Sequence, residues 1–86
     1  MKAPDDLATR VTSKTEFSAF LAALAADARR NAATWENNDL PRFLEALAAW
    51  HKDAEAFYRN TGQSVDVSAP SWRLFADMLS AARVYE

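Results

Sequence analysis

A single histidine, His51, is the first candidate for chemistry in this chain of 86 residues. Glu55 follows one helical turn later and could share a metal ion with the imidazole. Two ligands at positions i and i+4 are too few for a zinc site, which uses three or four protein ligands. A general base needs a nucleophile within hydrogen-bond reach, and the sequence around His51 indicates none. We therefore interpret His51 as a residue at the edge of the core and predict no metal, cofactor or catalytic residue.

The carboxylates are scattered along the chain rather than paired. Glu45 and Asp77 are predicted to point away from the apolar sides of their helices. Arg73 lies four residues before Asp77, a spacing typical of an exposed ion pair that contributes roughly a few tenths of a kcal/mol. The pattern lacks the two adjacent carboxylates that acid–base catalysis would use.

Arg83 differs from the other charged residues because it falls on a predicted apolar stripe. A guanidinium there must reach solvent or pair with a carboxylate. Asp27 is the expected partner, since it flanks the stripe of another helix and a bidentate arginine stabilises an ionised carboxylate. We predict a structural ion pair between Asp27 and Arg83. The alternative is a pocket for an anion or small molecule, or an active site, formed by Asp27, His51 and Arg83 together.

Three helices must position these side chains. Nineteen residues are alanine and one is glycine, a composition that favours helices over strands. Capping signals and apolar periodicity predict helices over about 14–30, 40–60 and 70–85. We therefore predict an all-α fold: a compact, antiparallel three-helix domain over residues 13–86, with the longest helix at its centre. Residues 1–12 have no apolar period and are predicted to be a mobile N-terminal segment.

The predicted helix ends rest on local signals. Ser13 and Glu16 have the spacing of a capping box, in which the serine side chain accepts an orphan backbone amide. The other signals are Asn38 or Asp39 as the cap before Pro41, Gly62 as a left-handed helix-ending residue, and Ser68 or Ser71 as the cap of the last helix.

The predicted core follows from apolar residues that recur every three or four positions on each helix. Its members are Phe17, Phe20, Leu21, Leu24 and Ala28, then Leu40, Phe43, Leu44, Leu47, Trp50, Ala54, Phe57 and Tyr58, and finally Trp72, Phe75, Ala76, Leu79 and Ala82. Trp35, in the connection over 32–38, and Trp72 are expected to close the two ends of this core.

Composition bounds the classes of partner. The formal net charge is -2, so the chain lacks the clustered basic residues that hold a phosphate backbone, and we predict no nucleic-acid partner. The longest apolar stretch, 17–26, is about half the length of a membrane span, so we predict no membrane partner. The absence of cysteine fits a reducing compartment, and we predict a cytoplasmic location.

Two clusters of aromatic and polar residues suggest an interaction surface. They consist of Trp35, Glu36 and Asn37, and of Ser71, Trp72 and Arg73. Bulky aromatics among polar groups are typical of interface anchors, although helix capping and closure of the core would account for the same residues. Our leading hypothesis is a non-enzymatic protein-interaction module with an unidentified protein partner, present as a monomer or a homodimer.

Several short motifs resemble those of a family of small, uncharacterised bacterial proteins known only as a domain of unknown function. The resemblance covers residues 12–86. It rests on Thr12-Ser13-Lys14 with Glu16-Phe17, Trp35-Glu36-Asn37 with Leu40, Phe43-Leu44-Glu45-Ala46 with Ala49-Trp50, Tyr58-Arg59-Asn60 with Gly62, Pro70-Ser71-Trp72-Arg73 with Phe75-Ala76-Asp77, and Ala81-Ala82-Arg83-Val84-Tyr85-Glu86. Membership implies a stand-alone protein and carries over no activity, cofactor or catalytic residue.

Overall fold

The computed structural model describes residues 7–86, which form three α-helices and one short 3-10 helix. The elements are α2 (Lys14–Arg30), η1 (Ala32–Thr34), α3 (Leu40–Asn60) and α4 (Trp72–Ala82). The described residues contain no strand, so the predicted all-α, three-helix domain is confirmed. The predicted bounds of α2 and α3 are also confirmed, whereas α4 is shorter at both ends than the predicted helix over 70–85.

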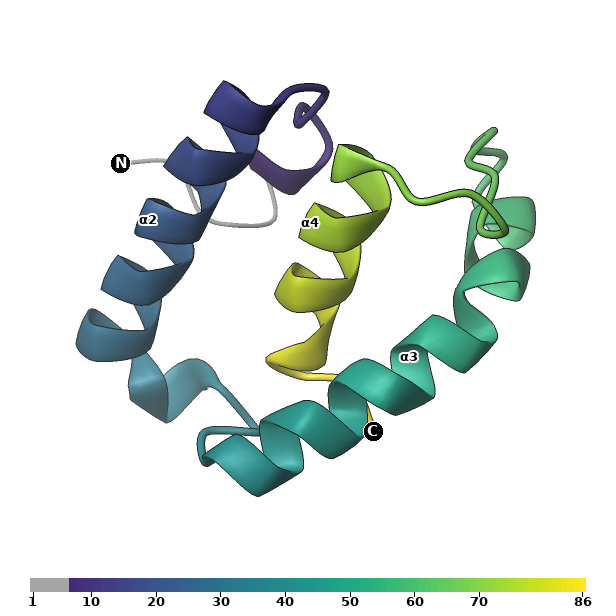
Figure 1. The fold of residues 1–86 in the computed structure, drawn as a ribbon. Helices are drawn as coiled ribbons and strands as arrows, with labels where there is room; N and C mark the ends of the chain where they lie inside the picture. Colours follow the sequence, from purple (N-terminus) through teal and green to yellow (C-terminus); the bar gives the residue numbers. More distant parts are fainter. Residues whose placement is uncertain (1–6) are drawn as a thin grey trace.

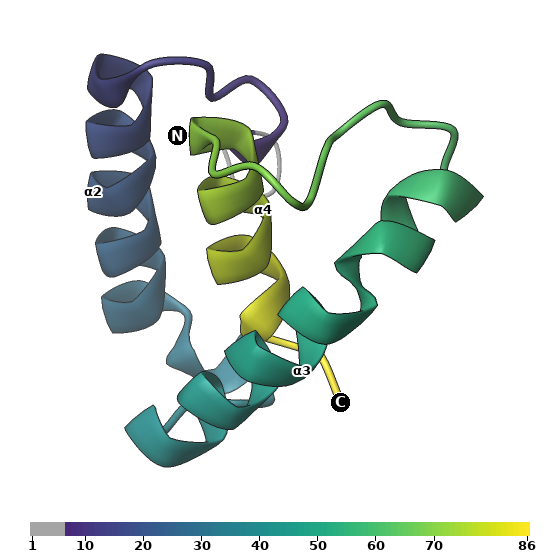
Figure 2. The same cartoon turned by 45° about the vertical axis from the view of Figure 1, so that its right-hand side comes forward.

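The central helix is α4, not the longest helix as the sequence predicted. Figure 1 shows α4 between α2 and α3, running in the same direction as α2, and Figure 2 shows α3 diverging from the other two. No Cα atom of α2 lies within 8 Å of a Cα atom of α3, whereas α4 packs against both. The arrangement follows from the apolar residues of α4, which occupy two sides of a helix whose small residues, Ala76 and Ala82, are fully buried.

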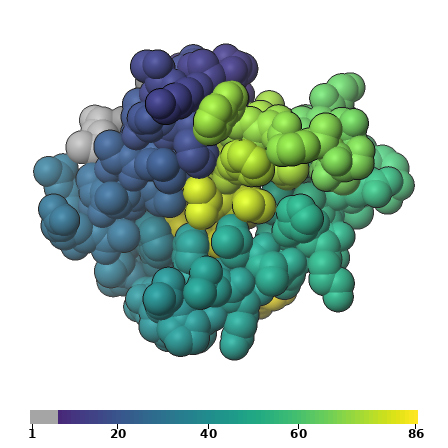
Figure 3. All heavy atoms as spheres, in the orientation of Figure 1, coloured from purple at the N-terminus to yellow at the C-terminus, as the bar shows by residue number. Residues whose placement is uncertain are grey.

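The core is therefore divided into two clusters, one on each side of α4. The first contains Ala8, Val11, Phe20, Leu24 and Ala76, with Leu7, Phe17, Trp35 and Leu79 packed against it. The second contains Trp50, Ala54, Tyr58 and Leu74, with Val65, Val67, Met78, Ala81 and Tyr85 packed against it. In the space-filling view only part of α4 is visible between its neighbours (Figure 3).

Several predicted core residues lie at the surface. Leu40 is 68% exposed and Leu44 is 51% exposed, because the first turns of α3 extend beyond the part that α4 covers. Trp72 is 38% exposed and packs its ring on Phe17 rather than closing the core. The predicted stripe also omitted Leu74, which is 3% exposed and contacts α3.

Part of the segment predicted to be mobile is packed. Ala8 and Val11 are buried in the first cluster, and Arg10 and Val11 donate backbone hydrogen bonds to the carbonyls of Leu7 and Ala8. The sequence analysis did not identify this packing, in which two apolar side chains hold a short turn against a helix face. Residues 1–6 lie outside the described residues.

Local capping explains where the helices begin. Ser13 accepts a hydrogen bond from the Glu16 amide, and the Glu16 carboxylate in turn accepts one from the Thr12 amide. Asp39 caps α3 by accepting from the Arg42 amide. Ser71 caps α4 in the same way, by accepting from the amide of the residue three positions later. Each cap satisfies a backbone donor that has no partner inside its helix.

Gly62 ends α3 as predicted. Its φ angle is +69°, in the left-handed region that favours glycine. The Gln63 amide then donates to the Tyr58 carbonyl at 2.9 Å, which is the long bond of a Schellman motif. None of the helices in residues 7–86 has the length and apolar character that a membrane span requires.

Candidate functional site

Asp27 and Arg83 lie next to each other, as the ion-pair hypothesis requires. Arg83 Nη1 is 3.3 Å from Asp27 Oδ2, and the two side chains are only 11% and 15% exposed. Asp27 also accepts from the Trp35 indole nitrogen at 2.7 Å and from the Asn31 side-chain amide at 2.8 Å. The carboxylate thus joins α2, the connection to α3 and the end of α4.

The Arg83 guanidinium is held on two further sides. Its Nε donates to the Ser80 carbonyl at 2.8 Å, and its Cζ lies 5.9 Å from the centre of the Trp35 ring. Packing of a guanidinium over an indole face is favourable because the ring quadrupole attracts a cation. These contacts explain why an arginine can occupy an apolar stripe. Groups of the protein itself pair its charge, so no bound ligand is needed to explain its position.

The Asp27 network makes stability depend on pH. Hydrogen bonds from Trp35 and Asn31, and the Arg83 charge, lower the pKa of Asp27 below its ordinary value. The folded pKa lies below the unfolded one, so this contribution to the free energy of unfolding is present above about pH 4 and is lost as pH falls through the folded pKa. In urea titrations between pH 6 and pH 2, Asp27→Asn should flatten this part of the acid limb. An unchanged limb would contradict the assignment.

Asn37 binds the C-terminal end of α4. Its side-chain amide donates to the Ala82 carbonyl at 2.9 Å and to the Tyr85 carbonyl at 2.8 Å. Its backbone amide donates to the Arg83 carbonyl at 2.9 Å. Asn37 therefore satisfies carbonyls at the end of α4, where the helix itself supplies no donors.

We expect Asn37→Ala to lower the free energy of unfolding by about 1 kcal/mol, because it leaves two partly buried carbonyls without side-chain donors. Asn38→Ala is the matched control, since the Asn38 side chain makes only an exposed hydrogen bond, with Arg42. Chemical denaturation measures both. Equal losses for the two variants would show that Asn37 does not hold the end of α4.

The two predicted interaction clusters lie near opposite ends of α4 and do not form one surface. Glu36 is near Glu86, whose carboxylate raises the pKa of Glu36 through a hydrogen bond and its charge. Ser71, at the other end, is the N-cap of α4. Arg73 forms an ion pair with Asp77. These positions give most of the six residues a role in capping or packing.

His51 is exposed on α3 and belongs to a different part of the surface from Asp27. It lines a groove of about 350 Å³ with Leu44, Leu47, Ala48 and Met78. Neither Asp27 nor Arg83 lines this groove, so the structure does not bring them and His51 into one pocket there. The alternative site proposed from the sequence is therefore not formed.

A second buried network was missed by the sequence analysis. Asp77, predicted to point away from the core, is 9% exposed and accepts from the Tyr58 hydroxyl at 2.6 Å and from Arg73 Nε at 2.8 Å. Arg73 also donates to the Gln63 side chain. Burial, and next the Asp77 hydrogen bond and charge, raise the pKa of Tyr58. The prediction of an exposed Arg73–Asp77 pair is wrong because Tyr58 and the segment after α3 cover it.

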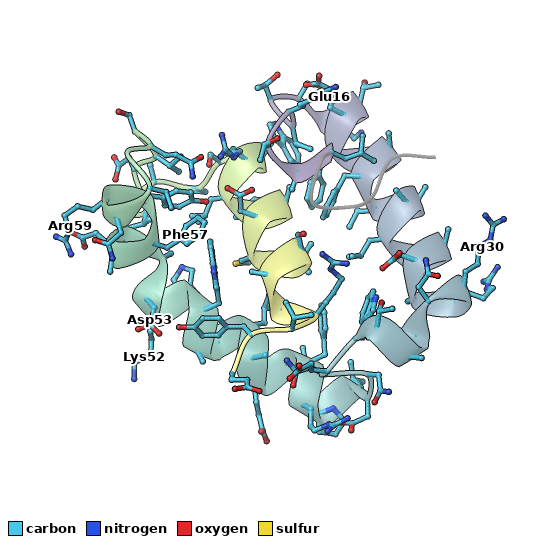
Figure 4. All side chains as sticks on the ribbon, turned by 180° about the vertical axis from the view of Figure 1, so that it is seen from behind. Glu16, Arg30, Lys52, Asp53, Phe57 and Arg59 are labelled. Atoms are coloured by element: carbon cyan, nitrogen blue, oxygen red, sulfur yellow. The ribbon has the colours of Figure 1, made fainter. Side chains whose placement is uncertain are left out.

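This network borders a cavity of about 200 Å³. Phe57 points from α3 toward α4 on one side of it (Figure 4). The lining residues are Ala8, Thr9, Phe57, Gln63, Arg73, Asp77, Ser80 and Ala81. Arg73 and Asp77, the charged residues that line this cavity, pair with each other. The main role of the network is therefore to stabilise the packing of α4 on α3.

A mostly exposed row of residues on α3, with Leu40 and Leu44 as its exposed leucines, forms the clearest candidate site. We call Leu40, Leu44, Leu47, Ala48 and His51 the α3 face. Their spacing of three and four residues places them on one side of the helix. At one end, Leu40 borders a cavity of about 240 Å³ that Trp35 and Phe43 also line. At the other end, the face continues into the groove beside Met78.

The sequence analysis identified the leucines of the α3 face as apolar positions but predicted them to be buried in the core. Periodicity marked Leu40, Leu44 and Leu47 as apolar positions, which is the same signal that a core-facing helix gives. Only the position of α4 separates them from the buried residues Trp50, Ala54 and Tyr58. The α3 face can bind another apolar surface, whereas neither polar network presents an unpaired reactive group for chemistry.

Comparison with known proteins agrees with the resemblance seen in the motifs. The family of unknown function DUF7660 matches residues 13–86. No curated protein and no solved structure matches the chain. The match covers most of the sequence and includes all three helices, Asp27, Arg83 and the whole α3 face. The chain therefore belongs to the family of unknown function DUF7660.

Proposed function

We propose that this chain is a non-enzymatic protein-interaction module of the cytoplasm that binds a protein through the α3 face. The observation that carries the proposal is the exposure of two neighbouring leucines, Leu40 at 68% and Leu44 at 51%, on a helix that buries its other large apolar residues more fully. Contiguous exposed apolar residues are typical of protein-interaction sites.

The shape of the α3 face suits the apolar side of a partner helix. A helix docks through residues spaced by three, four and seven positions, which enter hollows on the receiving surface. The cavity beside Trp35 and the groove beside Met78 offer two such hollows, joined by Leu40 and Leu44. Trp35 was one of the residues predicted to form an interaction surface, and it stacks on Phe43 with ring centres 5.7 Å apart.

The polar groups support a module that binds rather than catalyses. Tyr58 and Arg73 both donate hydrogen bonds to Asp77, and Arg83 forms an ion pair with Asp27. Their partners hold them in positions that stabilise the fold. A net charge of -2 favours a protein over a nucleic acid as the partner, and a chain without cysteine suits the reducing cytoplasm.

Site-specific photo-crosslinking in the cells that make the protein tests the proposal. A photoreactive amino acid replaces Leu44 in one version of the full chain and Leu21, an exposed leucine of α2, in the other. We expect a discrete protein adduct from position 44, lost when Leu40→Asp is added, and none from position 21. No discrete adduct from position 44, or equal adducts from both positions, would overturn the proposed function.

A further inference from the structure

The charged residues beside the α3 face identify a partner for it. Glu45 and Lys52 are both exposed, and Lys52 points away from the body of the molecule (Figure 4). They are seven residues apart, almost two helical turns, so they lie on the same flank of α3. Within residues 7–86, the ion pairs involve other residues. Glu45 and Lys52 thus place an acid and a base seven residues apart along the open side of the α3 face, away from α4.

This pair of charges is complementary to itself only in one arrangement. When two copies of α3 cross antiparallel about a two-fold axis, residues on one flank meet the same flank of the other copy. Glu45 of each copy then faces Lys52 of the other, twice per interface. In a parallel pair the two-fold axis would bring opposite flanks together, so Glu45 and Lys52 of one copy would not meet the charges of the other.

The apolar residues fit the same arrangement. The midpoint between Glu45 and Lys52 falls beside Ala48, whose small side chain allows two helices to approach closely at the crossing point. Leu44 then lies opposite the region of His51 in the second copy, where the groove of about 350 Å³ can receive it. The leucines are removed from water on both copies, since a two-fold interface buries the same patch twice.

We infer that the α3 face binds a second copy of this chain, with the two α3 helices antiparallel and Glu45 of each copy paired with Lys52 of the other. The inference rests on the proposed function, because it names the protein that the α3 face binds. It follows from the exposure of Leu44 together with the placement of Glu45 and Lys52.

Charge exchange between copies tests the arrangement. Sedimentation equilibrium of the full chain should show a monomer–dimer equilibrium, and the single variants Glu45→Lys and Lys52→Glu should each weaken it by about tenfold, because two attractive contacts become repulsive. An equimolar mixture of the two variants should restore association to within about threefold of the original, since every contact in the mixed dimer is again attractive. Lys14→Glu, an exposed change on α2, should have no effect.

Each contrary outcome has a separate meaning. A chain that stays monomeric up to about 1 mM, or a dimer that is indifferent to Glu45→Lys and to Leu44→Asp, would overturn the inference. A monomeric chain whose Leu44 adduct in cells contains a different protein would overturn the second-copy inference but leave the proposed function standing. Circular dichroism of each variant checks that these exposed substitutions leave the fold intact.

Discussion

Asp77→Ala should lower the free energy of unfolding by about 3 kcal/mol. The carboxylate of Asp77 accepts hydrogen bonds from Tyr58 and Arg73, and its removal leaves a buried hydroxyl and a partly buried guanidinium without that partner. A partly buried charge that loses its carboxylate partner costs more than the loss of an ordinary hydrogen bond, because much of the group has already been taken out of water. Urea denaturation at pH 7 measures the change.

Two variants separate the parts of this effect. Tyr58→Phe keeps the ring and removes only the hydroxyl, so we expect a loss of about 1 kcal/mol. Glu55→Ala removes an exposed carboxylate and should change stability by less than about 0.5 kcal/mol. A loss for Asp77→Ala no larger than that for Glu55→Ala would show that the network does not stabilise the packing of α4 on α3.

Arg83→Met should cost about 2 kcal/mol, the second largest effect that we expect. The substitution preserves an apolar stem against Trp35 but removes the charge beside Asp27 and the donor to the Ser80 carbonyl. Asp27 keeps its hydrogen bonds from Trp35 and Asn31, so the loss should be smaller than for a carboxylate left without any partner.

A double-mutant cycle isolates the contribution of the ion pair. Asp27→Asn, Arg83→Met and the double variant are compared by chemical denaturation, and a coupling of about 1 kcal/mol is expected between the two side chains. If Arg83→Met left both stability and the packing of α2 beside α4 unaltered, the ion pair would have no role in fixing these helices.

The helices and their ends could be predicted from the sequence because the signals are local. Ser13 and Asp39 cap helices with the residues three positions after them, and Gly62 adopts its left-handed conformation within one turn of Tyr58. The Asp27–Arg83 contact was also accessible, because a single charged residue on an apolar stripe requires a partner on a facing helix.

Which helix covers which face could not be predicted in this way. Leu40 and Leu74 both occupy apolar positions, yet Leu40 is exposed and Leu74 is buried, because α4 packs on only part of α3. The environment of Asp77 depends on Tyr58, which is distant in the sequence and reaches Asp77 only in the folded chain. Periodicity reports the apolar side of a helix and not the neighbour that covers it.

Use of the α3 face for binding is the central claim, and methyl NMR of Leu44 tests it most directly. Spectra of the full chain with labelled leucine methyl groups are recorded in dilute buffer and in a concentrated extract of the cells that make the protein. The Leu44 signals should shift or broaden in the extract, where a binding partner covers them, or in buffer when the chain is concentrated, where a second copy covers them, while those of Leu21 stay unchanged. Unchanged Leu44 signals, with Leu44 as exposed to solvent in the extract as in buffer, would contradict the account.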